Sequence, residues 1–93
     1  MSYKLVYDDK FIKKSVKFLK KHPKLKDRYY KTLKILENNP FHPSLRLHKL
    51  QGTDYHSVSI TMNYRIVLYF LVVDNEIYLL DIDNHDNAYR DLK

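Results

Sequence analysis

The chain has 93 residues, no cysteine and a formal net charge of +6 at pH 7. This length provides for one modest hydrophobic core, so we expect a single domain over residues 1–93. The composition excludes disulfide bonds and thiolate metal sites. No apolar run is long enough for a signal core or a bilayer span, which predicts a cytoplasmic protein without membrane contact.

The positive charge is concentrated in the first half of the chain. Residues 1–50 carry 14 Lys and Arg against four Asp and Glu, a net charge of +10. Residues 51–93 carry three against seven, a net charge of −4. A basic half favours an anionic partner such as RNA, DNA, a ribosome or an acidic protein segment. A lysine surface that only keeps a small protein soluble is an equally ordinary interpretation.

The first half predicts one strand and two amphipathic helices. Residues 3–7 alternate and are rich in strand formers. Asp8 can cap a helix that ends at His22, because the residue before a proline is disfavoured in helical conformation. A second helix is expected from Lys24 to Asn38. Helical spacing predicts these inward-facing residues: Phe11, Ile12, Val16 and Leu19 with Phe18 beside them, then Leu25, Tyr29, Leu33 and Leu36.

The second half predicts three strands. Residues 55–60 alternate, and residues 61–63 form a turn. The continuous apolar run of residues 66–73 is typical of a strand covered on both faces. Asp74-Asn75 suits a two-residue hairpin turn into a last strand over residues 77–82. The order predicts an α+β fold: a strand, an antiparallel two-helix hairpin, then a three-stranded antiparallel meander, with the helices packed on one face of the sheet.

A basic cluster is expected to project from the loop of residues 41–54, ahead of the only glycine, Gly52. Its imidazole, His48, lies between the cations Arg46 and Lys49, a setting that suits general base or acid chemistry beside a phosphate. The alternative is a basic loop whose histidine only forms hydrogen bonds, because single motifs have many false positives. Three leucines are expected to anchor this segment: Leu45, Leu47 and Leu50.

Arg65 is a cation at the start of an otherwise apolar strand. Charges are tolerated in such runs where they emerge at the end of a sheet or are paired. An arginine in this position can clamp a phosphate through two N–H groups. A salt bridge with Asp81 or Asp83 is the alternative, and the sequence favours neither.

A polar segment, His85-Asp86 with Tyr89 and Arg90, follows the last predicted strand. A histidine at that edge can donate a proton to a leaving oxygen, and the tyrosine can stack on a base or orient a phosphate. A frayed tail is the alternative. The five histidines lack zinc spacing, and no glycine-rich phosphate loop is present, so we expect neither a metal nor a small-molecule cofactor.

Three stretches carry a family resemblance: LHKLQG at residues 47–52, YRIVLY at 64–69, and IYLLDI at 77–82 leading into His85 and Tyr89. Together with the order of elements they resemble the RelE/ParE superfamily of bacterial toxins from type II toxin–antitoxin modules, and within it the RelE/YafQ-like mRNA interferases. The resemblance covers nearly the whole chain. It implies a RelE-like fold, an endoribonuclease that cleaves mRNA in the ribosomal A site, and an acidic antitoxin that wraps and silences it.

The resemblance also implies roles for individual residues. His48 would be a general base or acid, His85 a general acid, Tyr89 the aromatic that follows it, and Arg65 a contact to the substrate. The implied substrate-binding residues are Arg46, Lys49, Tyr64 and Arg90. The implied reaction is attack of a 2′-OH on the adjacent phosphate, which gives a cyclic phosphate and a free 5′-OH and needs no metal.

One position departs from the family pattern. Many relatives carry an arginine on the last strand, four positions before the second histidine, where this chain has Asp81. Arg65 or Lys49 is then the candidate cation for the transition state. Two other functions stay open: a ParE-like inhibitor of DNA gyrase, against which the paired histidines argue, and a catalytically inactive homologue that only binds an antitoxin or a nucleic acid.

Overall fold

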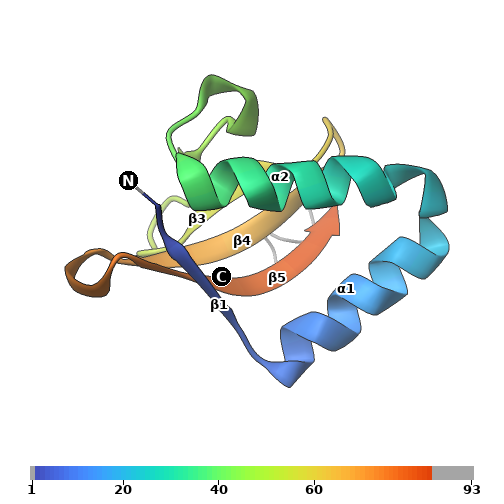
Figure 1. Ribbon diagram of the computed structural model, residues 1–93, viewed down its shortest axis with the longest axis horizontal. Helices are drawn as coiled ribbons and strands as arrows, with labels where there is room; N and C mark the ends of the chain where they lie inside the picture. The colour runs from blue at the N-terminus through green and yellow to red at the C-terminus, as the bar shows by residue number, and fades with distance from the viewer. Residues whose placement is uncertain (1, 85–93) are drawn as a thin grey trace.

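The computed structural model describes residues 2–84, in which two helices cover one face of a five-stranded sheet (Figure 1). The helices are α1 (Asp9–Lys21) and α2 (Lys26–Asn38). The strands are β1 (Lys4–Tyr7), β2 (His48–Lys49), β3 (His56–Ser59), β4 (Tyr64–Leu71) and β5 (Glu76–Asn84). The predicted α+β arrangement, with both helices on one face, is therefore confirmed.

The sheet has the order β1-β5-β4-β3-β2. Strands β3, β4 and β5 form the predicted antiparallel meander. The first strand of the chain joins it by pairing in parallel with the last, a connection that the two intervening helices make possible. The two-residue strand β2 pairs with β3 at the opposite edge. The pairing of β4 with β5 shifts register after Val67, which leaves one extra residue on β5.

The connection between β4 and β5 differs from the prediction. Pairing stops at Leu71 and Glu76, so the turn contains residues 72–75 rather than Asp74-Asn75 alone. A short 3₁₀ turn, η3, spans Val72–Asp74, and Asn75 follows with a φ of 54°. A two-residue turn of the favoured type needs positive φ at both central residues, and here only Asn75 adopts it. The predicted strand therefore ends two residues early.

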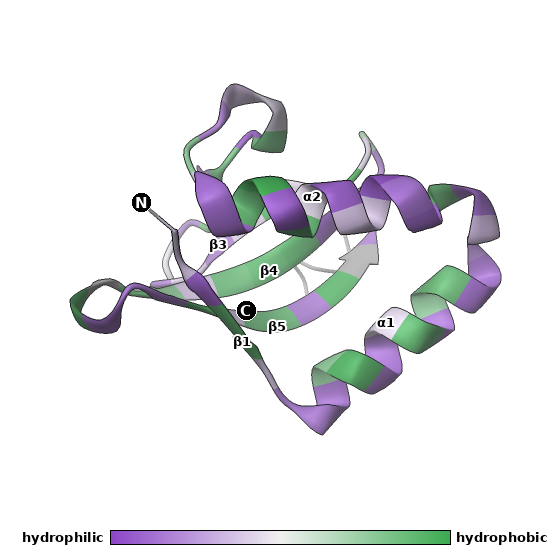
Figure 2. Cartoon of the chain, viewed as in Figure 1, coloured by the Kyte–Doolittle hydropathy of each residue, from purple (hydrophilic) through white to green (hydrophobic). Residues whose placement is uncertain are grey.

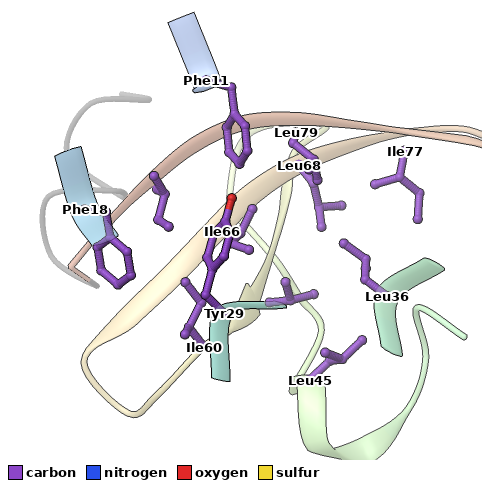
Figure 3. Close-up of a cluster of buried hydrophobic side chains, with 12 residues drawn as sticks. Phe11, Phe18, Tyr29, Leu36, Leu45, Ile60, Ile66, Leu68, Ile77 and Leu79 are labelled. Carbon is purple, nitrogen blue, oxygen red and sulfur yellow. The ribbon is translucent and has the colours of Figure 1, made fainter. Parts of the chain in front are cut away.

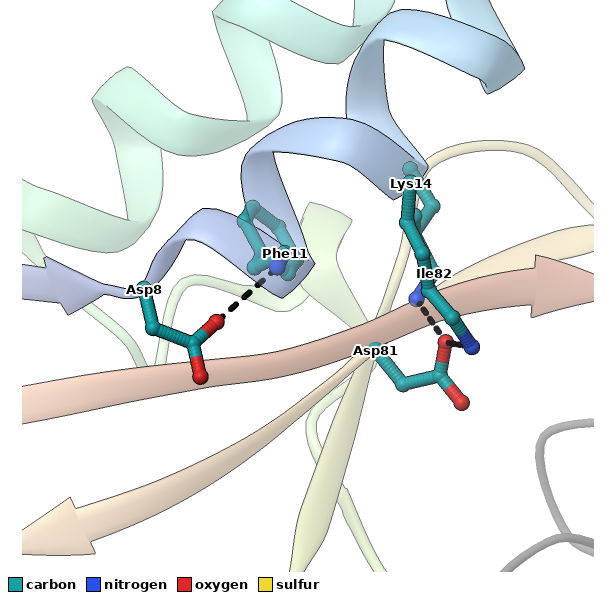
Figure 4. Close-up of polar contacts among 5 residues, drawn as sticks. All are labelled: Asp8, Phe11, Lys14, Asp81 and Ile82. Atoms are coloured by element: carbon teal, nitrogen blue, oxygen red, sulfur yellow. Dashed lines mark hydrogen bonds and ion pairs between the residues drawn. The ribbon is translucent and has the colours of Figure 1, made fainter.

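The predicted limits of α1 are confirmed at both ends. The Asp8 carboxylate accepts a hydrogen bond from the backbone N–H of Phe11 at 2.9 Å (Figure 4). The helix stops before His22-Pro23. A 3₁₀ turn, η1 (Pro23–Leu25), then delays α2 by two residues relative to the prediction. The helices run in opposite directions from this turn and diverge away from it (Figure 1).

The main core lies between the helices and the sheet (Figure 3). Phe11, Phe18, Tyr29 and Leu36 supply its helical side, and apolar residues of β4 and β5 supply the sheet side (Figure 2).

The inward orientation predicted for Ile12 and Val16 is wrong, because 43% and 47% of these residues are exposed. The divergence of the helices leaves this flank of α1 uncovered. Ile12 and Val16 instead line a groove that also includes exposed aromatics: Tyr7 and Tyr30.

A smaller apolar cluster lies on the face of the sheet opposite the helices, which we call the opposite face. It consists of Leu50 and Val67, with Tyr55 and Leu80 packed against them. Residues 66–68 of β4 are thus buried from both sides, as the apolar run predicted. The prediction is wrong for the rest of the run, where Tyr69 is 37% exposed and Val73, in the turn after the strand, is 91% exposed. No helix in the part of the chain described here has both the length and the apolar character needed to cross a membrane.

Candidate functional site

The first two residues of β4 point to opposite faces of the sheet, because successive strand side chains alternate. Tyr64 faces the helices, where its ring lies 5.2 Å from that of Phe18 and 4.6 Å from that of His22, measured between centroids. Arg65 lies on the opposite face. These two neighbours, both predicted to contact substrate, therefore belong to different surfaces that meet at one end of the sheet.

Arg65 is only 8% exposed, and its guanidinium donates three hydrogen bonds to other parts of the chain. Nε donates to Ser57 Oγ at 2.7 Å, and Nη2 donates to the backbone carbonyls of Arg46 at 2.8 Å and Ser57 at 3.2 Å. A buried cation is stable only where its donors are bonded. These bonds fix the guanidinium beside β3 and hold the loop before β2 against the sheet.

His48 shares the opposite face with Ser57 and Arg65. It pairs with Ser57 across β2 and β3, and directly opposed residues of an antiparallel pair project to the same side. The imidazole is exposed. Sheet pairing thus brings together the mid-chain histidine and the arginine on which the predicted chemistry depends, with Ser57 between them.

Lys49 and Arg46 are separated from this cluster in different ways. Lys49 pairs with His56, so its side chain lies toward the helix side of the sheet edge. Arg46 has a left-handed backbone, with a φ of 50°, and its carbonyl accepts the bond from Arg65. The Arg46 side chain is exposed and lines a polar hollow together with Arg28 and Ser59.

The positive charges at the β2 edge of the sheet affect the pKa of their neighbour His56. Burial, followed by the charges of Lys49 and His48, lowers the pKa of His56 below its ordinary value. Its Nδ1 is buried and has no hydrogen-bond partner within residues 2–84. The neutral imidazole therefore serves as packing against Phe70, at 5.1 Å between ring centroids.

Asp81, the departure from the family pattern, has a structural role at the irregularity between β4 and β5. Its Oδ1 lies 2.6 Å from Lys14 Nζ and accepts a hydrogen bond from the backbone N–H of Ile82 at 2.7 Å (Figure 4). The carboxylate therefore fastens α1 to β5. Its interaction with Lys14 also shows that one of the α1 lysines is more than a solvating charge.

The predicted roles of His85, Tyr89 and Arg90 fall outside the described residues, so their approach to His48 stays a prediction. Within residues 2–84 no group of three or more His, Asp and Glu side chains is arranged to hold a metal ion. The sequence interpretation missed Ser57 as the partner of Arg65. The signal available was its alternation with the apolar Val58 on a strand next to that of the arginine.

Comparison with known proteins gives matches by structure alone. No family model and no curated protein matches the sequence. YafQ in the Escherichia coli DinJ–YafQ toxin–antitoxin complex superposes with a TM-score of 0.75 at 17% identity, covering 96% of this chain and 99% of that one. A Pyrococcus horikoshii RelE–RelB complex gives 0.70 at 25% identity, covering 90% and 96%. Staphylococcus aureus YoeB gives 0.67 at 20% identity, covering 91% and 99%.

These matches define the class of fold. The chain has the fold of the toxins of toxin–antitoxin modules, over nearly its full length and nearly the full length of each structure. The matching structures include YafQ, RelE and YoeB. The resemblance to the RelE/ParE superfamily inferred from the sequence is therefore confirmed at the level of the fold.

Proposed function

We propose that this protein is the toxin of a type II toxin–antitoxin module and that residues 1–93, as one domain, form a metal-independent endoribonuclease that cleaves mRNA in the ribosomal A site. The observation that carries the proposal is the sharing of one sheet face by His48 and Arg65, in a chain with the toxin fold. A histidine beside a fixed guanidinium is a suitable pair for phosphodiester chemistry, because one exchanges protons and the other is a permanent cation.

In the proposed reaction His48 removes the proton of a 2′-OH, which attacks the adjacent phosphate. The P–O5′ bond breaks, and His85 gives a proton to the leaving oxygen. Arg65 stabilises the charge that develops on the phosphate, for which a guanidinium held rigidly in advance is effective. Arg46, Tyr89 and Arg90 are the proposed contacts that position the RNA, and Lys49 is a further proposed contact from the helix side of the sheet edge. Tyr64 faces the helices, so we assign it to the flanking RNA discussed below.

The decisive experiment is to induce the protein in cells and map new 5′ ends on mRNA for the wild type, His48→Ala and His85→Ala. Each substitution should lower cleavage roughly 10²- to 10⁴-fold, the usual contribution of one proton transfer. Gln51→Ala is the matched control, because Gln51 is exposed in the same loop and has no proposed role. Wild-type cleavage by both histidine variants would refute the mechanism. A supercoiling assay run in parallel detects gyrase inhibition.

We also propose that an acidic antitoxin binds the groove between α1, α2 and β1. This groove is lined by apolar side chains that include Ile12, Val16 and Tyr30, and the exposed faces of both helices carry lysines. β1 is an edge strand, so one side of its backbone is available for pairing. The DinJ–YafQ and RelE–RelB structures are complexes of this kind of pair. Val16→Asp should abolish binding to the product of the neighbouring gene, whereas Lys31→Gln should not.

A further inference from the structure

A second polar surface lies at the same end of the sheet, on the side of the helices. It is a cleft of about 410 Å³ between the C-terminal half of α1 and the paired ends of β4 and β5, where Tyr64 lies opposite Asn84. The residues that give it its chemistry are Lys14, Lys17, Lys21, His22, Tyr64 and Asn84.

The cleft carries an excess of positive charge. Its three lysines follow one another at helical spacing on the same side of α1. Asp81 neutralises Lys14, and this is the only ion pair in the part of the chain whose side chains the structure describes. Lys17 and Lys21 are exposed and have no acidic partner in that part of the chain. Lysines in a last turn also offset the negative end of the helix dipole, but that effect is confined to the final turn and leaves Lys17 unexplained.

Aromatic rings form one wall of the cleft. The rings of Tyr64 and His22 are 4.6 Å apart, and Phe18 packs against both, at 5.2 Å and 5.0 Å between centroids. Tyr64 and His22 are each partly exposed, so they present surface to a ligand. Cations beside aromatic rings are typical of surfaces that bind single-stranded nucleic acid, because lysines contact the phosphates and the rings stack on the bases.

We propose that this cleft binds the RNA strand next to the cleaved bond, with Lys17 and Lys21 on its phosphates and Tyr64 against a base. Tyr64 and Arg65 are consecutive residues on opposite faces, so an RNA strand lying over Arg65 reaches the cleft by passing round the end of β4. The inference rests on the proposed function for the identity of the ligand. It extends the substrate from the reacting nucleotides to a flanking segment.

The test measures binding rather than cleavage, so that it does not depend on nuclease activity. A fluorescent RNA oligonucleotide with 2′-O-methyl groups, which cannot be cleaved by 2′-OH attack, is titrated with the full chain at several salt concentrations. The test variant is Lys17→Gln with Lys21→Gln. The control is Lys13→Gln with Lys20→Gln, which removes the same charge from exposed positions of the same helix outside the cleft. A dinucleotide that spans only the scissile bond is the second probe.

We expect the test variant to bind the oligonucleotide more weakly, with a log–log salt slope smaller by about 1.4, the value for two lost contacts to a single strand. The control should change the slope by much less, and the dinucleotide should bind both variants alike. Tyr64→Ala should weaken oligonucleotide binding, and Tyr64→Phe should restore it. Equal losses in the test and control variants would refute the proposal, as would lost binding of an acidic antitoxin peptide with RNA binding unchanged. Absence of cleavage with normal RNA binding would refute only the nuclease function.

Discussion

Replacing Arg65 by lysine tests whether this guanidinium holds the site together. Lysine keeps the charge but has one nitrogen, which cannot occupy the places of both Nε and Nη2. Those atoms make three hydrogen bonds, to Ser57 Oγ and to the carbonyls of Ser57 and Arg46. Hydrogen bonds to a charged group contribute about 1.5–3 kcal/mol each. The loss of one or two of them predicts that Arg65→Lys lowers the free energy of unfolding by about 3 kcal/mol.

Urea denaturation measures this effect, and the midpoint should fall without a change in slope. Ser57→Ala is the matched variant, because it removes only the partner of Nε, and we expect it to cost about half as much. In the Arg65→Lys background the same serine substitution should cost little, since its bond is already lost. Arg65→Lys with wild-type stability would refute this account, and so would full additivity of the two substitutions.

Three further predictions concern packing, capping and pH. Leu36 is fully buried, so Leu36→Ala should lower the free energy of unfolding by about 2–5 kcal/mol, measured by urea denaturation. The control is Lys34→Ala, a truncation at an exposed position of the same helix. Asp8→Ala removes the cap of α1 and should cost about 1 kcal/mol, with Asp8→Asn retaining most of it. The folded state lowers the pKa of His56 below 6.5, so the unfolded chain binds more protons just below that pH. Stability should therefore decline as the pH falls through this range, and less so in His56→Gln; an equal decline in both would contradict the assignment.

Features encoded by neighbouring residues were predictable from the sequence. The Asp8 cap and the stop at His22-Pro23 are local, and the burial of residues 66–68 of β4 on both faces follows from an unbroken apolar run. The exposure of Ile12 and Val16 was not predictable, because helical periodicity identifies an apolar stripe but not how far two helices diverge. The prediction of a two-residue turn after β4 was also wrong. The positive φ of Asn75 is compatible both with such a turn and with the longer connection that forms.

In the candidate site, too, only the locally encoded features were predictable from the sequence. The leucines expected to anchor the segment of residues 45–50 left His48 to project, and an isolated charge marked Arg65. Their association depends on the pairing of β2 with β3 and of β3 with β4, which no local pattern specifies. The same holds for Asp81, whose partner Lys14 lies on the first helix. Partners that are distant in the sequence become visible only when the sheet is assembled.

The parallel pairing of β1 with β5 has a consequence for biosynthesis. Lys4 pairs with Glu76, so β1 has no strand to join until residues 76–79 have been translated. Non-local pairings of this kind form late in folding. A nascent chain that still lacks its last strand would have neither a complete sheet nor the second wall of its core. A cell making this protein would thus hold a complete sheet only after the last strand has been translated, which leaves an interval in which a partner already present can bind the chain first.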